Sequence, residues 1–138
     1  MSTVSVTHLA DQKFRVETRD HVVLVDQPAD DGTEVGPTPL ELLVMALASC
    51  AAHYGVAQLR ADGLPADGLM VQARWTTRPD PVRVGRVSLR IVLPAPLEPA
   101  QQQRLLAAID HCAVHNTLRC PPQVEIEVAE PSMLAIGR

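Results

Sequence analysis

The chain of 138 residues has few aromatic side chains and no surplus of basic ones. Its Phe, Tyr and Trp residues are Phe14, Tyr54 and Trp75, so it offers no aromatic surface on which nucleic-acid bases could stack. Asp and Glu outnumber Lys and Arg by 16 to 12, and the two signs are mixed along the sequence. Because nucleic-acid-binding proteins usually carry a basic patch, we expect no nucleic acid among the partners.

The sequence also lacks an export signal and the dense cysteine spacing of a disulfide scaffold. Its first residues show no charged segment followed by an apolar run and a cleavage site, as a signal peptide would. The chain has three cysteines. In a reducing cytoplasm a cysteine is more often catalytic, redox-active or buried than part of a structural disulfide. We therefore expect a cytoplasmic protein, and the absence of repeats and long linkers predicts a single domain over residues 1–138.

The dominant feature that is present is a long apolar stretch with complete helix-start signals. Thr38 is suited to be the N-cap, Pro39 occupies the first helical position, and Glu41 lies at the third, which is the capping-box spacing. With Gly63 as the C-terminal cap, the pattern predicts a helix over residues 38–61.

This predicted helix has no polar stripe between Leu40 and Ala52. We therefore expect it to be buried nearly all round, by a sheet or by a partner chain. Its length meets the criterion for a membrane span, but the polar residues Glu41, His53 and Arg60 interrupt it. We expect no association with a membrane.

Shorter segments with strand periodicity surround the helix, and a second helical region follows them. We expect strands at residues 3–9, 13–18 and 21–27 before the helix, and at 69–77, 82–93 and 124–128 after it. In the strand 82–93 the apolar phase slips at Gly85-Arg86, which predicts a β-bulge. Residues 100–118 are helical by pattern, as one helix kinked near His111 or as two short ones. The order is β-β-β-α-β-β-α-(α)-β, an α+β fold.

Two motifs carry a resemblance to a known family: G-P-T-P-x-E-L-L at 36–43 with A-S-C at 48–50, and C-A-V-H-x-T-L at 112–118. In these motifs and in its element order the chain resembles the OsmC/Ohr family of osmotically induced and organic hydroperoxide resistance proteins, in particular its OsmC-like branch. The resemblance implies an intertwined homodimer with its central helices buried together. It also implies cysteine-based reduction of organic hydroperoxides without a cofactor, and turnover would need an external thiol or dithiol.

The same resemblance implies roles for particular residues. Cys50 matches the peroxidatic cysteine of the family, Cys112 matches its resolving partner, and Arg19 is the closest match to the arginine that serves the thiolate and peroxide, with Arg15 as the competitor. Two cysteines on distant apolar helices are also what a cycle of sulfenic acid and disulfide requires. Leu40 stands where the peroxidase branch commonly has glutamate.

Two further residues are possible tuning groups for Cys50. Family members often pair a glutamate near Glu41 with the arginine, but the capping box already explains Glu41 here. Nine residues at 100° each also place Glu41 on the opposite side of an ideal helix from Cys50. His53 follows Cys50 by about one turn and is either a tuning group or a hydrogen-bonded interior or interface histidine.

Other hypotheses remain open at this point. Cys50 and Cys112 could be small buried apolar residues or redox sensors in a non-catalytic dimer that binds an apolar ligand. Four residues, His111, Cys112, His115 and Cys120, could also form a zinc site, although their spacing is not a usual one.

Overall fold

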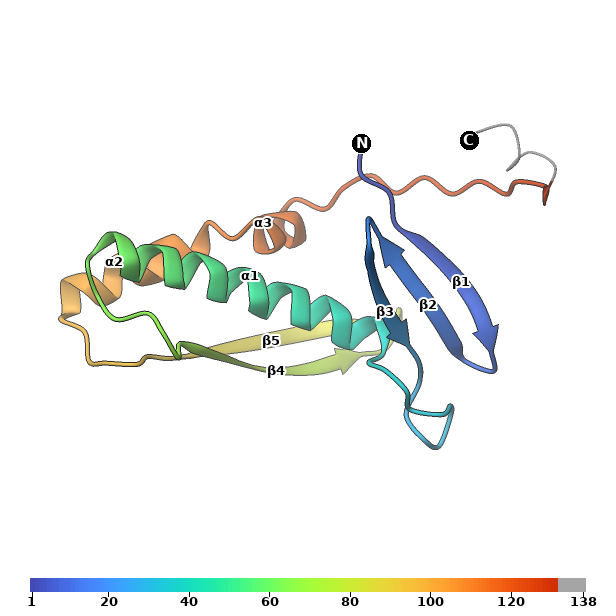
Figure 1. The fold of residues 1–138 in the computed structure, drawn as a ribbon, viewed down its shortest axis with the longest axis horizontal. Coiled ribbons are helices and arrows are strands. Elements are labelled where there is room, and N and C mark those ends of the chain that lie inside the picture. The colour runs from blue at the N-terminus through green and yellow to red at the C-terminus, as the bar shows by residue number, and fades with distance from the viewer. Residues whose placement is uncertain (132–138) are drawn as a thin grey trace.

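The computed structural model describes residues 1–131 and has an α+β architecture. Its elements in chain order are β1 (Ser5–Ala10), β2 (Lys13–Thr18), β3 (His21–Val25), α1 (Pro39–Ala61), β4 (Met70–Arg78), β5 (Arg83–Val92), α2 (Pro99–Asp110) and α3 (Ala113–Arg119). The strands form two antiparallel sheets, a β1-β2-β3 meander and a β4-β5 hairpin. In Figure 1 the long helix α1 runs along the β4-β5 hairpin, with α2 and α3 beside it, and the meander stands next to the first turns of α1.

Both ends of α1 follow from local chemistry, and the predicted span of 38–61 is confirmed to within one residue. The hydroxyl of Thr38 accepts the backbone N–H of Glu41 at 3.2 Å, which satisfies one of the first unpaired donors of the helix. At the other end Gly63 adopts a positive φ of 67°. The N–H groups of Gly63 and Leu64 there donate to the carbonyls of Arg60 and Leu59, which is a Schellman ending.

The expectation that α1 is buried nearly all round is wrong for the single chain. One stripe is buried, at Val44, Leu47, Ala51, Gly55 and Leu59, because this face packs against the β4-β5 hairpin and α2. Side chains on other faces remain in solvent, such as Met45 at 53 % exposure. By length and composition α1 could cross a membrane, but its buried stripe makes it the core helix of a soluble fold.

A compact loop delivers the chain from β3 to α1. The carboxylate of Asp26 is fully buried and accepts the hydroxyl of Thr33 at 2.6 Å and the backbone N–H groups of Gln27, Thr33 and Val35. At the end of this loop Gly36 approaches β3 so closely that a Cβ atom would lie 2.0 Å from the carbonyl oxygen of Leu24. The loop therefore requires both the buried acid and the glycine.

The β4-β5 hairpin contains the bulge that the sequence predicts. Thr76 pairs with Arg86 and Thr77 pairs with Val84, so Gly85 is the extra, unpaired residue. The bulge restores Val84 to the half-buried face that Val87 continues.

The last two predicted elements differ from the structure in different ways. The helical region 100–118 is two helices that break at His111 and Cys112, which is the second of the two predicted alternatives. The strand predicted at 124–128 is wrong for this chain by itself. A strand needs a neighbour, and within the described part of the chain residues 121–130 have no strand partner; Val124, Ile126 and Val128 are 76 %, 91 % and 94 % exposed.

Candidate functional site

The fold brings together two cysteines that lie far apart in the sequence. Cys50 lies on α1 and is half-buried, whereas Cys112 forms the corner between α2 and α3 and is 1 % exposed. Both are free thiols, and the side chain of each shifts the pKa of the other. The packing of α3 on α1 therefore creates a thiol pair.

The start of α3 also acts on Cys50. Cys112 is the N-cap residue of α3, and the backbone N–H groups of the next two residues, Ala113 and Val114, form hydrogen bonds with Cys50. The first N–H groups of a helix have no partner within the helix, and such donors favour a negative charge beside them.

These contacts divide the two thiols into an acidic one and a neutral one. Burial raises the pKa of Cys50, but the hydrogen bond from Cys112 and those from the N–H groups of Val114 and Ala113 outweigh it, so that the pKa is lowered. Burial raises the pKa of Cys112, and its hydrogen bond to Cys50 raises it further, with only partial compensation by backbone N–H groups. Cys50 is thus the thiol that ionises first.

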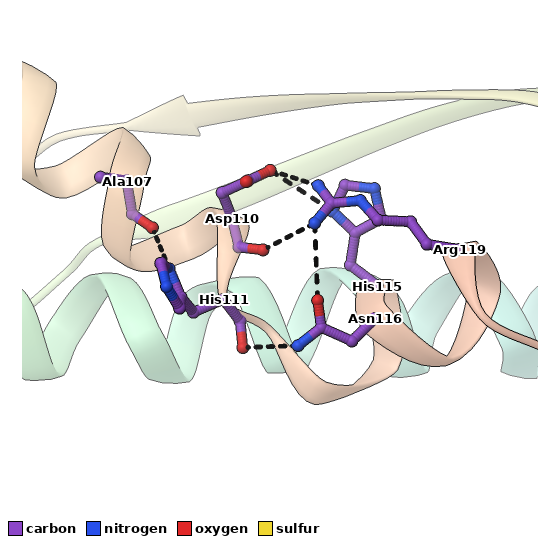
Figure 2. A network of polar contacts seen from close by, with 6 residues as sticks. All are labelled: Ala107, Asp110, His111, His115, Asn116 and Arg119. Atoms are coloured by element: carbon purple, nitrogen blue, oxygen red, sulfur yellow. Dashed lines mark hydrogen bonds and ion pairs between the residues drawn. The ribbon is translucent and has the colours of Figure 1, made fainter.

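A network of polar contacts also joins the end of α2 to α3 at this corner (Figure 2). The guanidinium of Arg119 donates to the carboxylate of Asp110 and, at 3.2 Å, to its backbone carbonyl. The ring of His115 lies 3.2 Å from the same guanidinium, and the side chain of Asn116 donates to the carbonyl of His111 at 3.4 Å. The hydrogen bond from Arg119 holds the pKa of Asp110 below its ordinary value, aided by the nearby positive charges. Asp110 is therefore a carboxylate at neutral pH.

A groove with a volume of about 1160 Å³ lies beside this corner. Its walls come from α1, β5, α2 and α3, and its lining includes the apolar side chains of Leu40, Leu47, Leu106 and Leu118. The charged and polar side chains of the lining are those of Arg83, Arg86, Asp110, His115 and Arg119. Neither cysteine lines the groove, so the groove and the thiol pair are separate features.

A model of the OsmC-like protein family matches residues 30–127 of this sequence. The chain belongs to the OsmC-like family. The match includes α1 with Cys50 and the corner with Cys112, and it also covers residues 121–127, which have no strand partner in the single chain. A search of curated protein sequences found no match.

Solved structures share the OsmC-like fold at low sequence identity. A protein from Psychrobacter arcticus described as an osmotic stress induced and detoxification response protein is 23 % identical, with a TM-score of 0.78, over 85 % of this chain and 88 % of its own. An organic hydroperoxide resistance protein OsmC from Legionella pneumophila is 16 % identical, with a TM-score of 0.67 over 86 % and 89 %. A Vibrio cholerae protein described as an organic hydroperoxide resistance protein, with captopril bound in one of the active sites, is 21 % identical, with a TM-score of 0.65 over 86 % and 85 %. At these identities the likeness shows the fold.

In this OsmC-like chain the two arginines considered for the site lie on the meander. Arg19 is exposed in the turn between β2 and β3, where it has a positive φ of 51°. Arg15 forms an ion pair with Glu17 at 3.0 Å on the surface of the sheet. The groups that move the pKa of Cys50 belong to residues 112–114, so neither arginine is among them within one chain.

The two possible tuning residues lie elsewhere on α1. Glu41 sits in the first turn and lines a small hollow of about 290 Å³ with Trp75 and other hairpin residues; it donates its backbone N–H to Thr38. His53 is exposed, and its ring meets that of Tyr54 edge-on at 5.5 Å. Neither side chain is among the groups that act on Cys50.

The residues of the zinc hypothesis do not form a ligand set. Cys120 is exposed after the end of α3, while Cys112 is buried against Cys50. In residues 1–131 no group of three or more His, Cys, Asp or Glu side chains is placed to hold a metal ion.

Sequence reasoning did not identify the partners that surround the thiol pair. The donors of Ala113 and Val114 are backbone groups, so no residue type marks them. Asp110 and Arg119 end two successive helices, and their spacing in the sequence does not indicate that they meet.

Proposed function

We propose that this OsmC-like protein is a thiol-dependent peroxidase that reduces organic hydroperoxides. The observation that supports this proposal most directly is the pairing of Cys50, whose pKa is lowered, with the protonated thiol of Cys112. A thiol of ordinary pKa near 8.5 is only about 3 % ionised at pH 7, and the thiolate is the nucleophile. The lowered pKa of Cys50 increases its thiolate fraction at neutral pH. The fold also places a second thiol, that of Cys112, beside it.

The proposed cycle has three steps. The Cys50 thiolate attacks one peroxide oxygen, the O–O bond breaks, and the alkoxide takes a proton and leaves as an alcohol while Cys50 becomes a sulfenic acid. The Cys112 sulfur then attacks the Cys50 sulfur, and water leaves as the disulfide forms. An external thiol or dithiol reduces this disulfide by thiol–disulfide exchange and returns both cysteines to the starting state.

We propose a homodimer as the working form, with the whole of residues 1–138 as one domain in the cytoplasm. A single chain leaves many apolar side chains in solvent on the meander, on α1 and in residues 121–130: Val22, Val23, Leu24, Leu43, Met45, Val124, Ile126 and Val128. Contact with a second copy of the chain would bury these side chains. Arg19 is not among the groups that lower the pKa of Cys50 within one chain, and we propose that the Arg19 of a second copy serves the thiolate and the peroxide. Sedimentation equilibrium that gave the mass of a monomer would refute the dimer.

The preference for organic hydroperoxides rests on the apolar surroundings. The part of α1 that surrounds Cys50 is mainly aliphatic, with Glu41 and Ser49 as the polar residues between Leu40 and Ala52. A polar peroxide would lose its hydration there without compensation, whereas an alkyl chain would gain from burial.

The test of the peroxidase proposal is a mass measurement on reduced protein after one equivalent of cumene hydroperoxide. We expect a loss of two hydrogens that maps to a Cys50–Cys112 disulfide. Cys50→Ser should not consume peroxide, and Cys112→Ser should consume it once and then accumulate oxidised Cys50. Cys120→Ser is the matched control, because Cys120 is an exposed thiol outside the pair. Full activity in Cys50→Ser would refute the mechanism.

A second candidate function is the binding of an apolar ligand by a non-catalytic dimer. The observation that favours it is the groove of about 1160 Å³ that does not include either thiol and that Leu40 helps to line. If it is correct, peroxide leaves the mass unchanged and an apolar fluorescent probe binds to the wild type but not to Leu40→Glu.

A further inference from the structure

The short helix α3 is held in an unusual way. It has seven residues and none of its side chains is buried. A helix of this length is not stable alone, and without a buried apolar face its orientation depends on its ends. Its first end is fixed by the N-cap residue Cys112, which is 1 % exposed, so the question is what fixes the second end.

Arg119, the last residue of α3, provides that second attachment. Its guanidinium reaches back to the last residue of α2 and bonds both the carboxylate and the backbone carbonyl of Asp110 (Figure 2). The planar fork of arginine suits two acceptors at once. It also supplies a partner for one of the carbonyls that the end of α2 leaves unpaired.

The contact between Asp110 and Arg119 closes the segment 110–119 into a loop, and Cys112 is part of this segment. Asn116 adds a bond across the loop to the carbonyl of His111, at 3.4 Å, and its backbone N–H donates to the carbonyl of Cys112 at 2.9 Å. If the Arg119 contact were lost, α3 could pivot about Cys112, which lies against Cys50.

We propose that Asp110 and Arg119 are positioning residues for the thiol pair, because their ion pair holds α3 in the orientation that presents Cys112 and the amides after it to Cys50. This inference deepens the proposed function, since it concerns the same two cysteines. Neither residue touches Cys50 itself; both act through the placement of α3.

The test measures the alkylation of Cys50 by iodoacetamide from pH 5 to pH 10, followed by peptide mass mapping so that Cys112 and Cys120 are scored separately. The variants are Asp110→Asn, which keeps the shape of the side chain, and Arg119→Gln. In both, we expect alkylation of Cys50 near pH 7 to slow by roughly two- to fivefold, the size of the interaction between helix-end donors and an anion, and the pH profile to move to higher pH. The rate of Cys50 alkylation in Arg119→Lys should lie between that of these two variants and that of the wild type, because lysine keeps the positive charge but lacks the two parallel N–H donors of the guanidinium.

The matched control is Arg104→Gln. This change removes the ion pair of Arg104 with Asp62, at 3.2 Å, which ties the same helix α2 to the end of α1 but does not involve α3. We expect a Cys50 profile identical to that of the wild type. If Asp110→Asn and Arg119→Gln also match the wild type while they remain folded by circular dichroism, the inference is wrong.

Alkylation does not require peroxide, so the two proposals fail separately. If the wild type consumes no hydroperoxide but the two variants show the shifted alkylation profile, the peroxidase proposal is wrong and the positioning role of Asp110 and Arg119 stands. Should Arg119→Gln unfold, the isosteric Asp110→Asn decides the result.

Discussion

Replacing Cys112 by alanine and by serine separates its two roles at the thiol pair. Both changes remove the resolving sulfur, but serine keeps a hydrogen-bond donor toward Cys50 and alanine does not. In the wild type the hydrogen bond from Cys112 is the strongest of the contacts that lower the pKa of Cys50. We therefore expect the pKa of Cys50 to rise in Cys112→Ala and to stay low in Cys112→Ser, because a hydroxyl is a better donor than a thiol.

The size of the effect follows from the partial burial of Cys50. A hydrogen bond to a charged group contributes about 1.5–3 kcal/mol, and the weak S–H donor and the contact of Cys50 with solvent reduce this to about 1 kcal/mol. That free energy corresponds to a fivefold change in the thiolate fraction near neutral pH. Alkylation of Cys50 at pH 7 should thus be about fivefold slower in Cys112→Ala than in Cys112→Ser.

The assay is the rate of iodoacetamide labelling of Cys50 as a function of pH, with Cys120→Ser as background so that one reactive thiol remains. The reasoning is refuted if the labelling of Cys50 has the same pH dependence in Cys112→Ala and Cys112→Ser, since the side chain at position 112 would then not contribute to the low pKa of Cys50.

Three further predictions concern the scaffold. The hydroxyl of Thr33 and the backbone N–H groups around it lower the pKa of Asp26, so its contribution to stability is present above the pKa of an unfolded aspartate and is lost as pH falls through the folded value; the melting temperature of the wild type should fall more between pH 6 and pH 3 than that of Asp26→Asn. Leu105→Ala, at 3 % exposure in the core, should cost about 2–5 kcal/mol in urea unfolding, and Leu106→Ala, at 54 %, well under half of that. Gly36→Ala must displace the backbone of Leu24 and should lower the melting temperature more than Gly63→Ala. A Cβ atom at position 63 has open space around it, so that Gly63→Ala meets only the cost of a positive φ, about 1 kcal/mol.

Features of the fold that depend on neighbours in the sequence could be predicted from it. The start of α1 is set by Thr38 and Pro39, its end by Gly63, and the bulge by a phase slip at Gly85, and each of these signals lies within a few residues of its effect. The strand at 124–128 could not be predicted correctly for one chain, because alternation shows that a segment is suited to a sheet but not whether a neighbouring strand exists.

The candidate site was predictable in its residue types and not in its surroundings. Motif resemblance identified Cys50 and Cys112, and the fold places them in contact. The amides of Ala113 and Val114 could not be found, because every residue carries the same backbone donor. The link from Asp110 to Arg119 depends on the angle between two helices, which the periodicity of either helix does not determine.

The bulge at Gly85 also bears on how the length of this chain could vary. Because Gly85 is the one residue of β5 that pairs with nothing, its deletion would join Val84 to Arg86 and leave every other side chain on its present face. A single deletion from Val87 onward in β5 would instead turn one part of the strand over and expose apolar side chains. The hairpin therefore contains one position at which a codon can be lost without reversing the sheet, and natural length variation in β5 should concentrate there.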